Sequence, residues 1–591
     1  MKPASTGSEA TPQTRYSQSR EFIRTLRSIP WRIGIALNKG YFRFQDWSGL
    51  FSYQKWYRMF EKREIEPDNS PDICISVLIK LGVQNLHLHK ETCHALIQQS
   101  HRNWEAYLIL EDEKINLPMS FPDDPRIKWM KSPFDPSWKA GVNAVKGDWV
   151  VFMNSGDTLS VDALTIISQK VMEDPLTTLI YTDSDRITGN HMTHHDPKFW
   201  PDWSPDLLLS VNYLNHVFIH ARELREATAK TSDLETALLL CVEKAGKIVH
   251  IPHVLYHHQE SQSKPWLEHT FQKGNLVAHL ERAGLNGVVA NTSPSRPVHF
   301  TWEFGKPLIS IIILTRDNVN LLKQCMDSIF DNTSYQNFEI VLVENNSRNA
   351  ETFNYYETLK SKPRVNVLVH NLPFNYSAFN NWGAQHSTGE ILLFLNNDIQ
   401  CFEPGWLEEM SRWATRPEVG VVGAKLLYPD GAIQHAGLVI GLEGHANHVF
   451  AKKAEGYQGL FGTDEWYRNY SAVTGACMMV RREVFDHIGG FDEHYSLAFN
   501  DIELCLRATK AGFRVVYTPF ARLFHHEGAT RAKYKPAKDI QLAWQHLKPL
   551  IERGDPYYNH NLSLSLRVPT LRRPDETPAV ERLAQILQYE G

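Results

Sequence analysis

Two acids and a histidine pair in the second half of the chain could act together in displacement chemistry. Asp398 follows the uninterrupted apolar run 391–395, with two asparagines between them. Asp501 opens a stretch with helical spacing, and the pair His525-His526 follows a short apolar stretch. A carboxylate and an imidazole can hold a divalent cation, while a second carboxylate removes a proton. The combination suggests displacement at a diphosphate ester whose departing phosphates the cation neutralises.

Each of these residues also has a purely structural interpretation. Asp398 could simply end a strand, and Asp501 could be a cap or first-turn acid of its helix. A histidine pair beside aromatic residues is more often structural than ligating. The order of these groups along the chain nevertheless favours the joint interpretation, because parallel strands place their carboxyl ends at one edge of the sheet.

Polar residues at the ends of two further strands could grip a nucleotide. Thr315 and Arg316 follow the apolar run 308–314, and Glu344 and Asn346 follow the run 339–343. In open α/β sheets the ligand lies in the crevice outside these strand ends. A nucleotide's base and ribose are therefore expected there.

The elements that would position these residues occur twice. Apolar strands begin at about residues 73 and 308, helical patterns separate the strands, and both units close on a proline, a short apolar stretch and a histidine pair. This alternation predicts two α/β units built from βαβ segments. With Gly147 set on Gly389, Gly156 falls on Asp398, so the carboxylate of the first copy is expected to be displaced to Asp157.

Composition limits the classes of function. The chain has 591 residues, 42% hydrophobic and 22% charged, with a formal net charge of −5. That acidic balance argues against a nucleic-acid partner. The seven cysteines are scattered in the manner of a reduced compartment. No apolar run approaches the roughly 18–20 residues of a membrane span, and the polar start does not look like a signal peptide. A cytoplasmic location is expected.

The remaining segments read as extensions. Residues 1–20 are expected to be disordered, and 21–70 combine aromatic with basic residues. That segment either packs its aromatics on the first unit, which we favour, or lies on the inner face of the cytoplasmic membrane. Residues 264–306 are expected to hold a helix at 276–282 and a linker at 291–297, and 536–591 a helical extension.

A series of ordered motifs carries a resemblance over roughly residues 70–535. These are Pro307-Leu308-Ile309-Ser310, Asn380-Asn381-Trp382-Gly383-Ala384, Leu395-Asn396-Asn397-Asp398, Gln434-His435-Ala436-Gly437, Asn469-Tyr470-Ser471, Gly489-Gly490-Phe491-Asp492 and, in the first half, Phe199-Trp200-Pro201-Asp202-Trp203-Ser204. The chain resembles glycosyltransferase family 2, the inverting nucleotide-sugar enzymes of GT-A fold. It is most similar to the tandem two-domain subgroup of bacterial surface-polysaccharide clusters.

The resemblance implies two tandem GT-A (Rossmann-like) domains, a degenerate one at 71–263 and a catalytic one at 307–535. In the second domain it implies Asp501 as the catalytic base and Asp398 with His525 or His526 as the metal site. The implied nucleotide-sugar contacts are Thr315, Arg316, Glu344, Asn346, Asn381, Gly383, Asn396 and Asn397, and the implied acceptor contacts are Gly475, Ala476 and Asn500.

The implied reaction is a single in-line displacement that inverts the anomeric centre. Its donor is a nucleoside-diphosphate sugar, its acceptor a hydroxyl of a glycan or lipid-linked oligosaccharide, and its cofactor Mg²⁺ or Mn²⁺.

The first domain departs from the family pattern. Asp157 stands alone after Asn154-Ser155-Gly156, and at the base position Leu234 falls on Asp501, unless a one-residue gap restores Asp233. We therefore expect this copy to be catalytically inactive and to bind the acceptor or act as a scaffold.

Three alternatives stay open or are weakened at this stage. Both domains could be active, or neither, in which case the protein would bind or assemble carbohydrate. The intact acidic set of the second domain argues against the latter. A nucleotidyltransferase would need a Gly-rich loop after the first strand, and Thr315-Arg316-Asp317 is not one.

Overall fold

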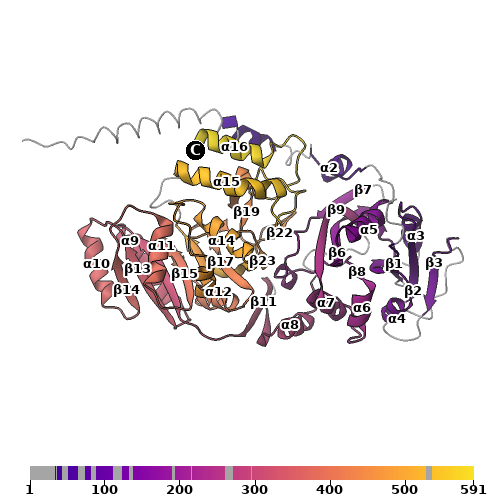
Figure 1. Cartoon of the computed structure of the whole chain (residues 1–591), viewed down its shortest axis with the longest axis horizontal. Coiled ribbons are helices and arrows are strands. Elements are labelled where there is room, and N and C mark those ends of the chain that lie inside the picture. Colours follow the sequence, from indigo (N-terminus) through magenta and orange to yellow (C-terminus); the bar gives the residue numbers. More distant parts are fainter. Residues whose placement is uncertain are drawn as a thin grey trace, which may run out of the picture.

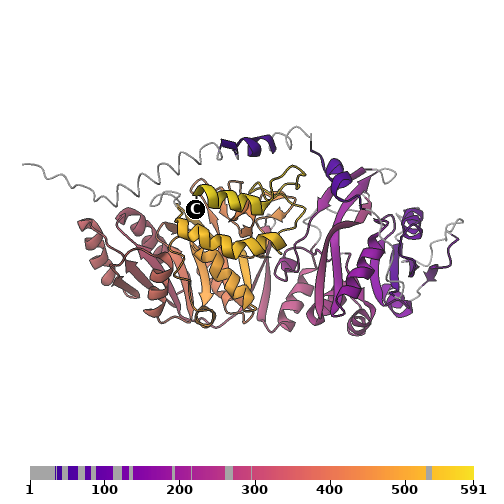
Figure 2. The same ribbon diagram turned by 45° about the horizontal axis from the view of Figure 1, so that its top comes forward.

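Two α/β units lie side by side in the computed structural model, with two C-terminal helices over the second unit (Figures 1 and 2). The structure describes residues 33–34, 36–42, 51–63, 73–81, 88–110, 123–131, 137–188, 193–214, 216–259, 270–293, 296–526 and 535–590. The stretch 1–20, expected to be disordered, lies outside these residues.

The first unit is a mixed sheet with the strand order β3-β2-β1-β4-β8-β6-β9-β5, and β7 pairs with β6. Its strands are β1 (Ile75–Leu81), β2 (Trp104–Leu110), β3 (Ile127–Lys131), β4 (Trp149–Asn154), β5 (Thr158–Leu159), β6 (Thr177–Thr188), β7 (Thr193–Lys198), β8 (Phe218–His220) and β9 (Lys247–Gln259). Its helices are α3 (His89–Ile97), α4 (Ser137–Ala144), α5 (Ala163–Glu173), α6 (Ala221–Thr228) and α7 (Leu234–Lys244).

The second unit repeats this order as β14-β13-β12-β15-β24-β17-β25-β16, and β18 pairs with β17. Its main strands are β12 (Ile309–Thr315), β13 (Phe338–Glu344), β14 (Val365–Val369), β15 (Ile391–Asn396), β16 (Ile399–Cys401), β17 (Val419–Leu427), β18 (Ile433–His435), β23 (Arg468–Asn469), β24 (Cys477–Arg481) and β25 (Arg514–His525). Its helices are α9 (Val319–Asp331), α10 (Ala350–Lys360), α11 (Tyr376–Gln385), α12 (Trp406–Ala414), α13 (Arg482–His487) and α14 (Asn500–Lys510). The expected pair of tandem α/β units is thus confirmed.

A buried polar cluster at the start of each sheet repeats almost atom for atom. In the second unit Ser310 Oγ donates to Glu339 Oε1 at 2.7 Å, and the Gly389 N–H donates to Ser310 Oγ at 2.8 Å. In the first unit Ser76 Oγ donates to Glu105 at 2.8 Å, and the Gly147 N–H to Ser76 Oγ at 3.0 Å. A Cβ atom on either glycine would lie 2.5 Å from the serine oxygen. Glycine is required at both positions by this close approach, which supports duplication.

The two units are joined through a buried ionic contact. Asp206, which follows the Trp-Pro-Asp-Trp-Ser-Pro motif of the first unit, accepts from Arg514 Nε of β25 at 3.0 Å and from Asn469 Nδ2 of β23 at 2.6 Å. Ser204 Oγ also donates to Asn469 Oδ1, at 2.9 Å. This motif therefore serves the interface between the units.

The N-terminal extension packs partly on the first unit. Helix α2 (Tyr53–Phe60) buries Trp56 completely, edge-on against Phe199 at 5.2 Å between ring centroids. The packing interpretation is confirmed for this helix. Residues 33–34 and 36–42 are helical as well and leave Ile33, Leu37 and Tyr41 more than half exposed.

The segment between the units differs from the expectation. Helix α8 (Lys273–Arg282) covers the predicted helix, but part of the expected linker forms an antiparallel hairpin of β10 (Asn286–Ser293) and β11 (Arg296–Glu303). Phe300 and Trp302 of β11 are buried. The turn-forming residues at 291–297 led to the expectation of a linker and hid this hairpin.

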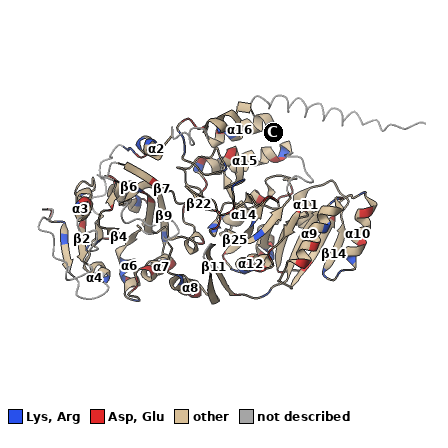
Figure 3. Ribbon diagram, turned by 180° about the vertical axis from the view of Figure 1, so that it is seen from behind, with Lys and Arg blue, Asp and Glu red and all other residues tan. Residues whose placement is uncertain are grey.

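The C-terminal extension covers both units. Helices α15 (Ala537–Arg553) and α16 (Ala579–Glu590) pack together over the second unit (Figure 1), and Leu583 and Ile586 of α16 are buried as expected. Between them, Asn559 donates to Asp183 of the first unit at 2.8 Å. Basic and acidic residues are interspersed over both units (Figure 3). Among the described residues, no helix combines the length and apolarity needed to cross a membrane.

Candidate active site

Asp398 and His525 meet at one edge of the second sheet. Asp398 lies between β15 and β16, and β16 pairs with the end of β25 so that Ile399 is opposite His525. His525 Nε2 lies 3.1 Å from Asp398 Oδ1, and both side chains are largely buried. Two ligand atoms bound at right angles to one cation at about 2.1 Å each are about 3 Å apart. The pair therefore has the spacing of two ligands of a single metal ion.

The tautomer of His525 is set by Gln434 of β18. Gln434 Oε1 lies 2.5 Å from His525 Nδ1, and the amide nitrogen of Gln434 donates to the His525 carbonyl at 3.3 Å. With the amide oriented in this way, Nδ1 carries a proton, so Nε2 is the ring nitrogen that can share a cation with Asp398. A partner on the second ring nitrogen is the usual support of a metal-binding histidine.

His526 points away from Asp398. Its Nε2 contacts Gln400 Oε1 at 3.0 Å and Gln324 Nε2 at 3.3 Å, while its backbone N–H donates to the Asp398 carbonyl. Of the two histidines predicted from the sequence, the structure thus brings only His525 to the carboxylate.

The asparagines after β15 link this pair to its surroundings. Asn396 Nδ2 lies 3.4 Å from His525 Nε2, and its backbone N–H donates to the Ala476 carbonyl at 2.9 Å. Asn397 Nδ2 donates to Thr315 Oγ1 at 3.4 Å. Both amides therefore lie where β12, β15 and β24 meet.

Asp501 is held at the N-terminus of α14 by backbone donors. Its Oδ2 accepts from the Gly475 N–H and its Oδ1 from the Ile502 N–H, both at 2.9 Å. Burial raises the pKa of Asp501 above the usual carboxyl range, although these hydrogen bonds lower it in part. A carboxylate with a raised pKa accepts a proton more readily, as a general base must.

Gly475 and Ala476 connect Asp501 to the metal-type pair. Gly475 binds Asp501, and the next residue, Ala476, binds Asn396. The neighbouring Asn500 is buried, and its Nδ2 has no hydrogen-bond partner among the described residues. The predicted base, the predicted acceptor residues and the predicted metal pair therefore form one connected group.

Thr315 and Glu344 are opposite each other at the ends of β12 and β13. Glu344 is buried and accepts from the Ser347 N–H at 2.5 Å, so its carboxylate orders the loop that carries the exposed Asn346. Asn346 has the left-handed backbone conformation, with φ of 55°. Strained backbone of this kind concentrates at functional sites. Arg316, next to Thr315, is exposed.

Asn381 and Gly383 occupy packing positions on α11. The Asn381 side chain donates to the Phe491 carbonyl and accepts from the Phe491 N–H, at 2.9 and 2.8 Å. A Cβ on Gly383 would lie 2.7 Å from Ile312 Cγ2 of the sheet. A nucleotide-binding role for either residue stays a prediction, whereas their contacts in the structure hold α11 in place.

The first unit retains the acid but not the pair. Asp157 directly precedes β5, whose Thr158 is opposite His257 of β9, just as Asp398 precedes β16 opposite His525. The ungapped register that placed Gly156 on Asp398 was wrong, because the turn after β4 is one residue longer and Gly156 takes up φ of 100°.

Other groups occupy the carboxylate of Asp157. Tyr256 Oη donates to it at 2.7 Å, and the Gln259 N–H at 3.0 Å. Burial raises the pKa of Asp157 to about 6, although these hydrogen bonds lower it in part. At the base position, Glu235 is the second residue of α7 as Asp501 is of α14, and it accepts from the Gln272 N–H. This geometry fits an inactive copy.

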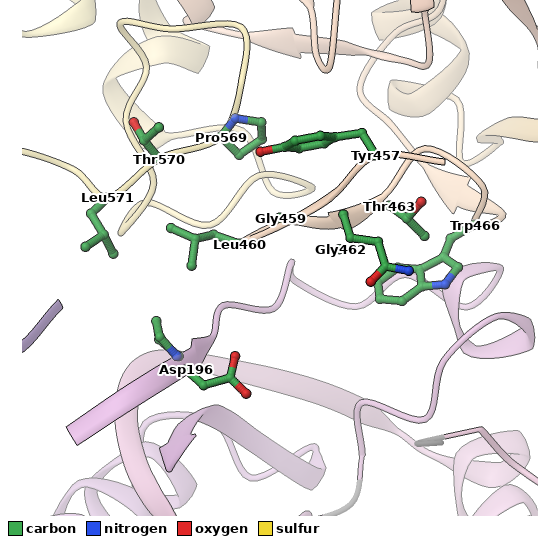
Figure 4. Close-up of a pocket in the computed structure, with 12 residues that line it drawn as sticks. Asp196, Tyr457, Gly459, Leu460, Gly462, Thr463, Trp466, Pro569, Thr570 and Leu571 are labelled. Atoms are coloured by element: carbon green, nitrogen blue, oxygen red, sulfur yellow. The ribbon is translucent and has the colours of Figure 1, made fainter. Parts of the chain in front are cut away.

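A cavity of about 490 Å³ lies between the units (Figure 4). Asp196 of the first unit is across the opening from Tyr457 and Trp466 of the second, and Thr570 of the C-terminal extension closes one side. Its wall is anchored to the sheet because Lys425 of β17 pairs with Asp464 at 2.6 Å. Sequence reasoning missed this cavity, which is assembled from three distant segments.

Residues 310–489 match the family model described as Glycosyl transferase family 2. The O-antigen biosynthesis protein RfbC of Myxococcus xanthus is 41% identical over 74% of this chain, and the uncharacterized protein y4gI of Sinorhizobium fredii is 35% identical over 83%. The chain spans only 35% and 58% of the lengths of these relatives.

A solved structure, GalNAc-T7 with UDP, GalNAc and Mn²⁺, aligns with a TM-score of 0.35 at 15% identity. That alignment covers 42% of this chain and 50% of the other.

Proposed function

We propose that the second domain, whose residues 310–489 match the model of glycosyl transferase family 2, transfers a sugar from a nucleoside-diphosphate donor to a hydroxyl of a growing cell-surface glycan. The strongest support is the connected group Asp501, Gly475, Ala476, Asn396 and His525, which ends at Asp398. It combines a base, an acceptor approach and a cation-type pair at one edge of the sheet. The similarity to an O-antigen biosynthesis protein supports a surface polysaccharide as the product.

We propose that Asp501 takes the proton of the acceptor hydroxyl as its oxygen attacks the anomeric carbon. The Gly475 and Ile502 N–H groups each donate to one oxygen of the Asp501 carboxylate and so fix its orientation. Because the pKa of Asp501 is raised, its carboxylate binds a proton more tightly than an ordinary aspartate does, which suits a general base. One base and one displacement lead to inversion of the anomeric centre.

The donor set fits a divalent cation. Asp398 offers a carboxylate oxygen and His525 offers Nε2, which lies 3.1 Å from that oxygen. When bound there, Mg²⁺ or Mn²⁺ supplies charge neutralisation to the departing nucleoside diphosphate. We propose that the nucleotide binds at the adjoining strand ends, which carry Thr315, Arg316, Glu344, Asn346 and Asn397.

The first domain acts, in this proposal, as a scaffold and a wall of the acceptor path. Its Asp157 is engaged by Tyr256, and the cavity between the units offers an acid, aromatic rings and hydroxyls to a carbohydrate (Figure 4). Aromatic rings with polar edges suit ligands that are both apolar and hydroxylated.

We also propose a peripheral contact with the inner face of the cytoplasmic membrane, where a lipid-linked acceptor would be met. Ile33, Leu37 and Tyr41 recur at four-residue spacing, which is close to the period of a helix, and their side chains are 54, 70 and 51% exposed. Co-sedimentation with anionic vesicles tests this contact. Leu37→Glu should abolish co-sedimentation, whereas unchanged binding by that variant would contradict it.

Turnover of nucleotide sugars tests the enzymatic proposal. The full-length chain should release nucleoside diphosphate from one donor of a panel in the presence of Mn²⁺, and Asp501→Asn should not. If the wild type turned over none of the donors, a carbohydrate-binding or assembly role would replace this one.

A further inference from the structure

A second group of potential metal ligands lies in the first unit, away from Asp157. Asp185 of β6, His194 of β7 and His257 of β9 present one ligand atom each, and all three atoms lie within 4.8 Å of one another. His257 Nδ1 is 2.6 Å from Asp185 Oδ1, and His194 Nδ1 is 2.8 Å from Asp185 Oδ2. The proposed reaction uses none of these residues.

The negative charge of Asp185 needs compensation. Its side chain is fully buried, and its ion-pair and hydrogen-bond partners in the described part of the chain are His194, His257 and the hydroxyl of Tyr53. A buried carboxylate beside two neutral imidazoles and a phenol would be costly.

Hydrogen-bond geometry indicates which nitrogen of His257 faces the carboxylate without a proton. Ser160 Oγ donates to the Val254 carbonyl at 3.0 Å and lies 3.0 Å from His257 Nε2. Because the hydroxyl has one proton, Nε2–H must donate to Ser160 in this arrangement. The Nδ1 lone pair then faces Asp185 Oδ1, and such an approach requires a cation between the two atoms, either a second proton or a metal ion.

We propose that Asp185, His194 and His257 bind a divalent transition-metal ion of the Zn²⁺ type. Two imidazoles and a carboxylate are a common zinc donor set, whereas the single imidazole near Asp398 suits Mg²⁺ or Mn²⁺. Zinc bonds of about 2.0–2.1 Å require these ligand atoms to separate by roughly half an ångström. The surrounding groups support the ligands, because Ser160 holds the second nitrogen of His257.

The proposed ion connects the N-terminal extension to the first unit. Tyr53 Oη of α2 donates to Asp185 at 2.8 Å, and the ring of Tyr57 stacks on His194 at 3.9 Å between centroids. Two successive residues of β9 serve the two sites, since Tyr256 reaches Asp157 while His257 reaches Asp185. The domain without a catalytic pair would thus use a metal to fasten α2.

Zinc content of the full-length protein tests this proposal. After removal of metals with a chelator, loading with Zn²⁺ and exhaustive dialysis, elemental analysis should find about one zinc ion per chain. Asp185→Asn should reduce this at least tenfold. His194→Phe should also reduce the zinc content at least tenfold. Because this variant keeps an aromatic ring against Tyr57, it controls for zinc lost through misfolding. In wild type alone, Zn²⁺ should raise the thermal midpoint, and Co²⁺ should give a visible ligand-field band.

Asp398→Asn is the matched control, because it removes the carboxylate of the proposed active site and should leave the zinc content unchanged. The readout does not depend on turnover, so it holds even if the proposed function is wrong. A wild type without retained zinc would overturn the proposal and leave a protonated histidine as the cation. Full zinc content in both folded variants would overturn it as well.

Discussion

Replacing Gln434 tests whether the tautomer of His525 matters for metal binding. Gln434 Oε1 lies 2.5 Å from His525 Nδ1 and forms the contact that orients the ring with Nε2 toward Asp398. Gln434→Leu keeps a side chain of similar size but replaces the amide that contacts His525 with an apolar group. Loss of such a contact typically weakens metal binding 10- to 100-fold, or about 1.4–2.8 kcal/mol. The dissociation constant for Mn²⁺ should rise by that factor, measured by titration calorimetry or by Mn²⁺ resonance.

Gln400 provides a control at nearly the same place. Its Oε1 lies 3.0 Å from Nε2 of His526, the histidine that faces away from Asp398. Gln400→Leu should leave Mn²⁺ affinity within about twofold. At saturating Mn²⁺, Gln434→Leu should recover most of its kcat, because the base is untouched. Equal Mn²⁺ affinity of Gln434→Leu and wild type would refute the reasoning, and weakening by Gln400→Leu alone would transfer the role to His526.

Three further predictions concern stability and pH. Asp206→Ala removes the buried carboxylate that accepts from Arg514 and Asn469 and leaves Arg514 with Glu418 as its remaining ionic partner among the described residues. The free energy of unfolding should fall by about 2 kcal/mol, seen as a lower thermal midpoint, and an unchanged midpoint would contradict the interface role. For Asp157, a pKa raised from 3.8 to about 6 makes the native state bind the proton more tightly, so stability falls as pH rises from about 4 to 6, by about 3 kcal/mol in total. Asp157→Asn should flatten that dependence in thermal melts, and persistence of the full slope would argue against it. Asp501 must be ionised to act as the base, and its pKa is raised above that of an ordinary aspartate. At saturating Mn²⁺, kcat/KM should therefore fall as the pH is lowered, with a midpoint above the ordinary aspartate pKa. A midpoint near 4 would contradict this assignment.

The strands and the acids that follow them could be predicted from the sequence because their signals are local. The run 391–395 is apolar throughout and the run 309–314 is interrupted only by Ser310, which is typical of strands buried on both faces, and the two runs form strands β15 and β12. The position of Asp501 near the start of its helix could be predicted from the apolar spacing of the residues that follow it. The site roles themselves stay predictions.

The parts that failed depend on contacts between distant residues. Gln434 and His525 are 91 residues apart, and nothing in either local sequence indicates their contact. The register between the copies failed through a single extra residue at the Gly156 turn, which no ungapped alignment can place. Which histidine faces Asp398 depends on the pairing of β16 with β25, because successive residues of a strand point to opposite sides.

The cluster at Asp185 was beyond sequence reasoning for a similar reason. Its ligands come from three strands, and its cover comes from a helix more than 130 residues earlier. A histidine pair was recognised at the end of the first unit, but its first member, His257, turns toward Asp185 instead of Asp157.

Release of nucleoside diphosphate by matched variants tests the central claim that the second domain holds the active site. A panel of nucleotide sugars would be offered with Mn²⁺ to the wild type, to Asp501→Asn and to Asp233→Asn, the last altering the helix cap of the first domain. We predict that Asp501→Asn loses at least about 100-fold in rate while Asp233→Asn stays within about twofold. Full activity of Asp501→Asn, or loss of activity in a folded Asp233→Asn alone, would contradict the account.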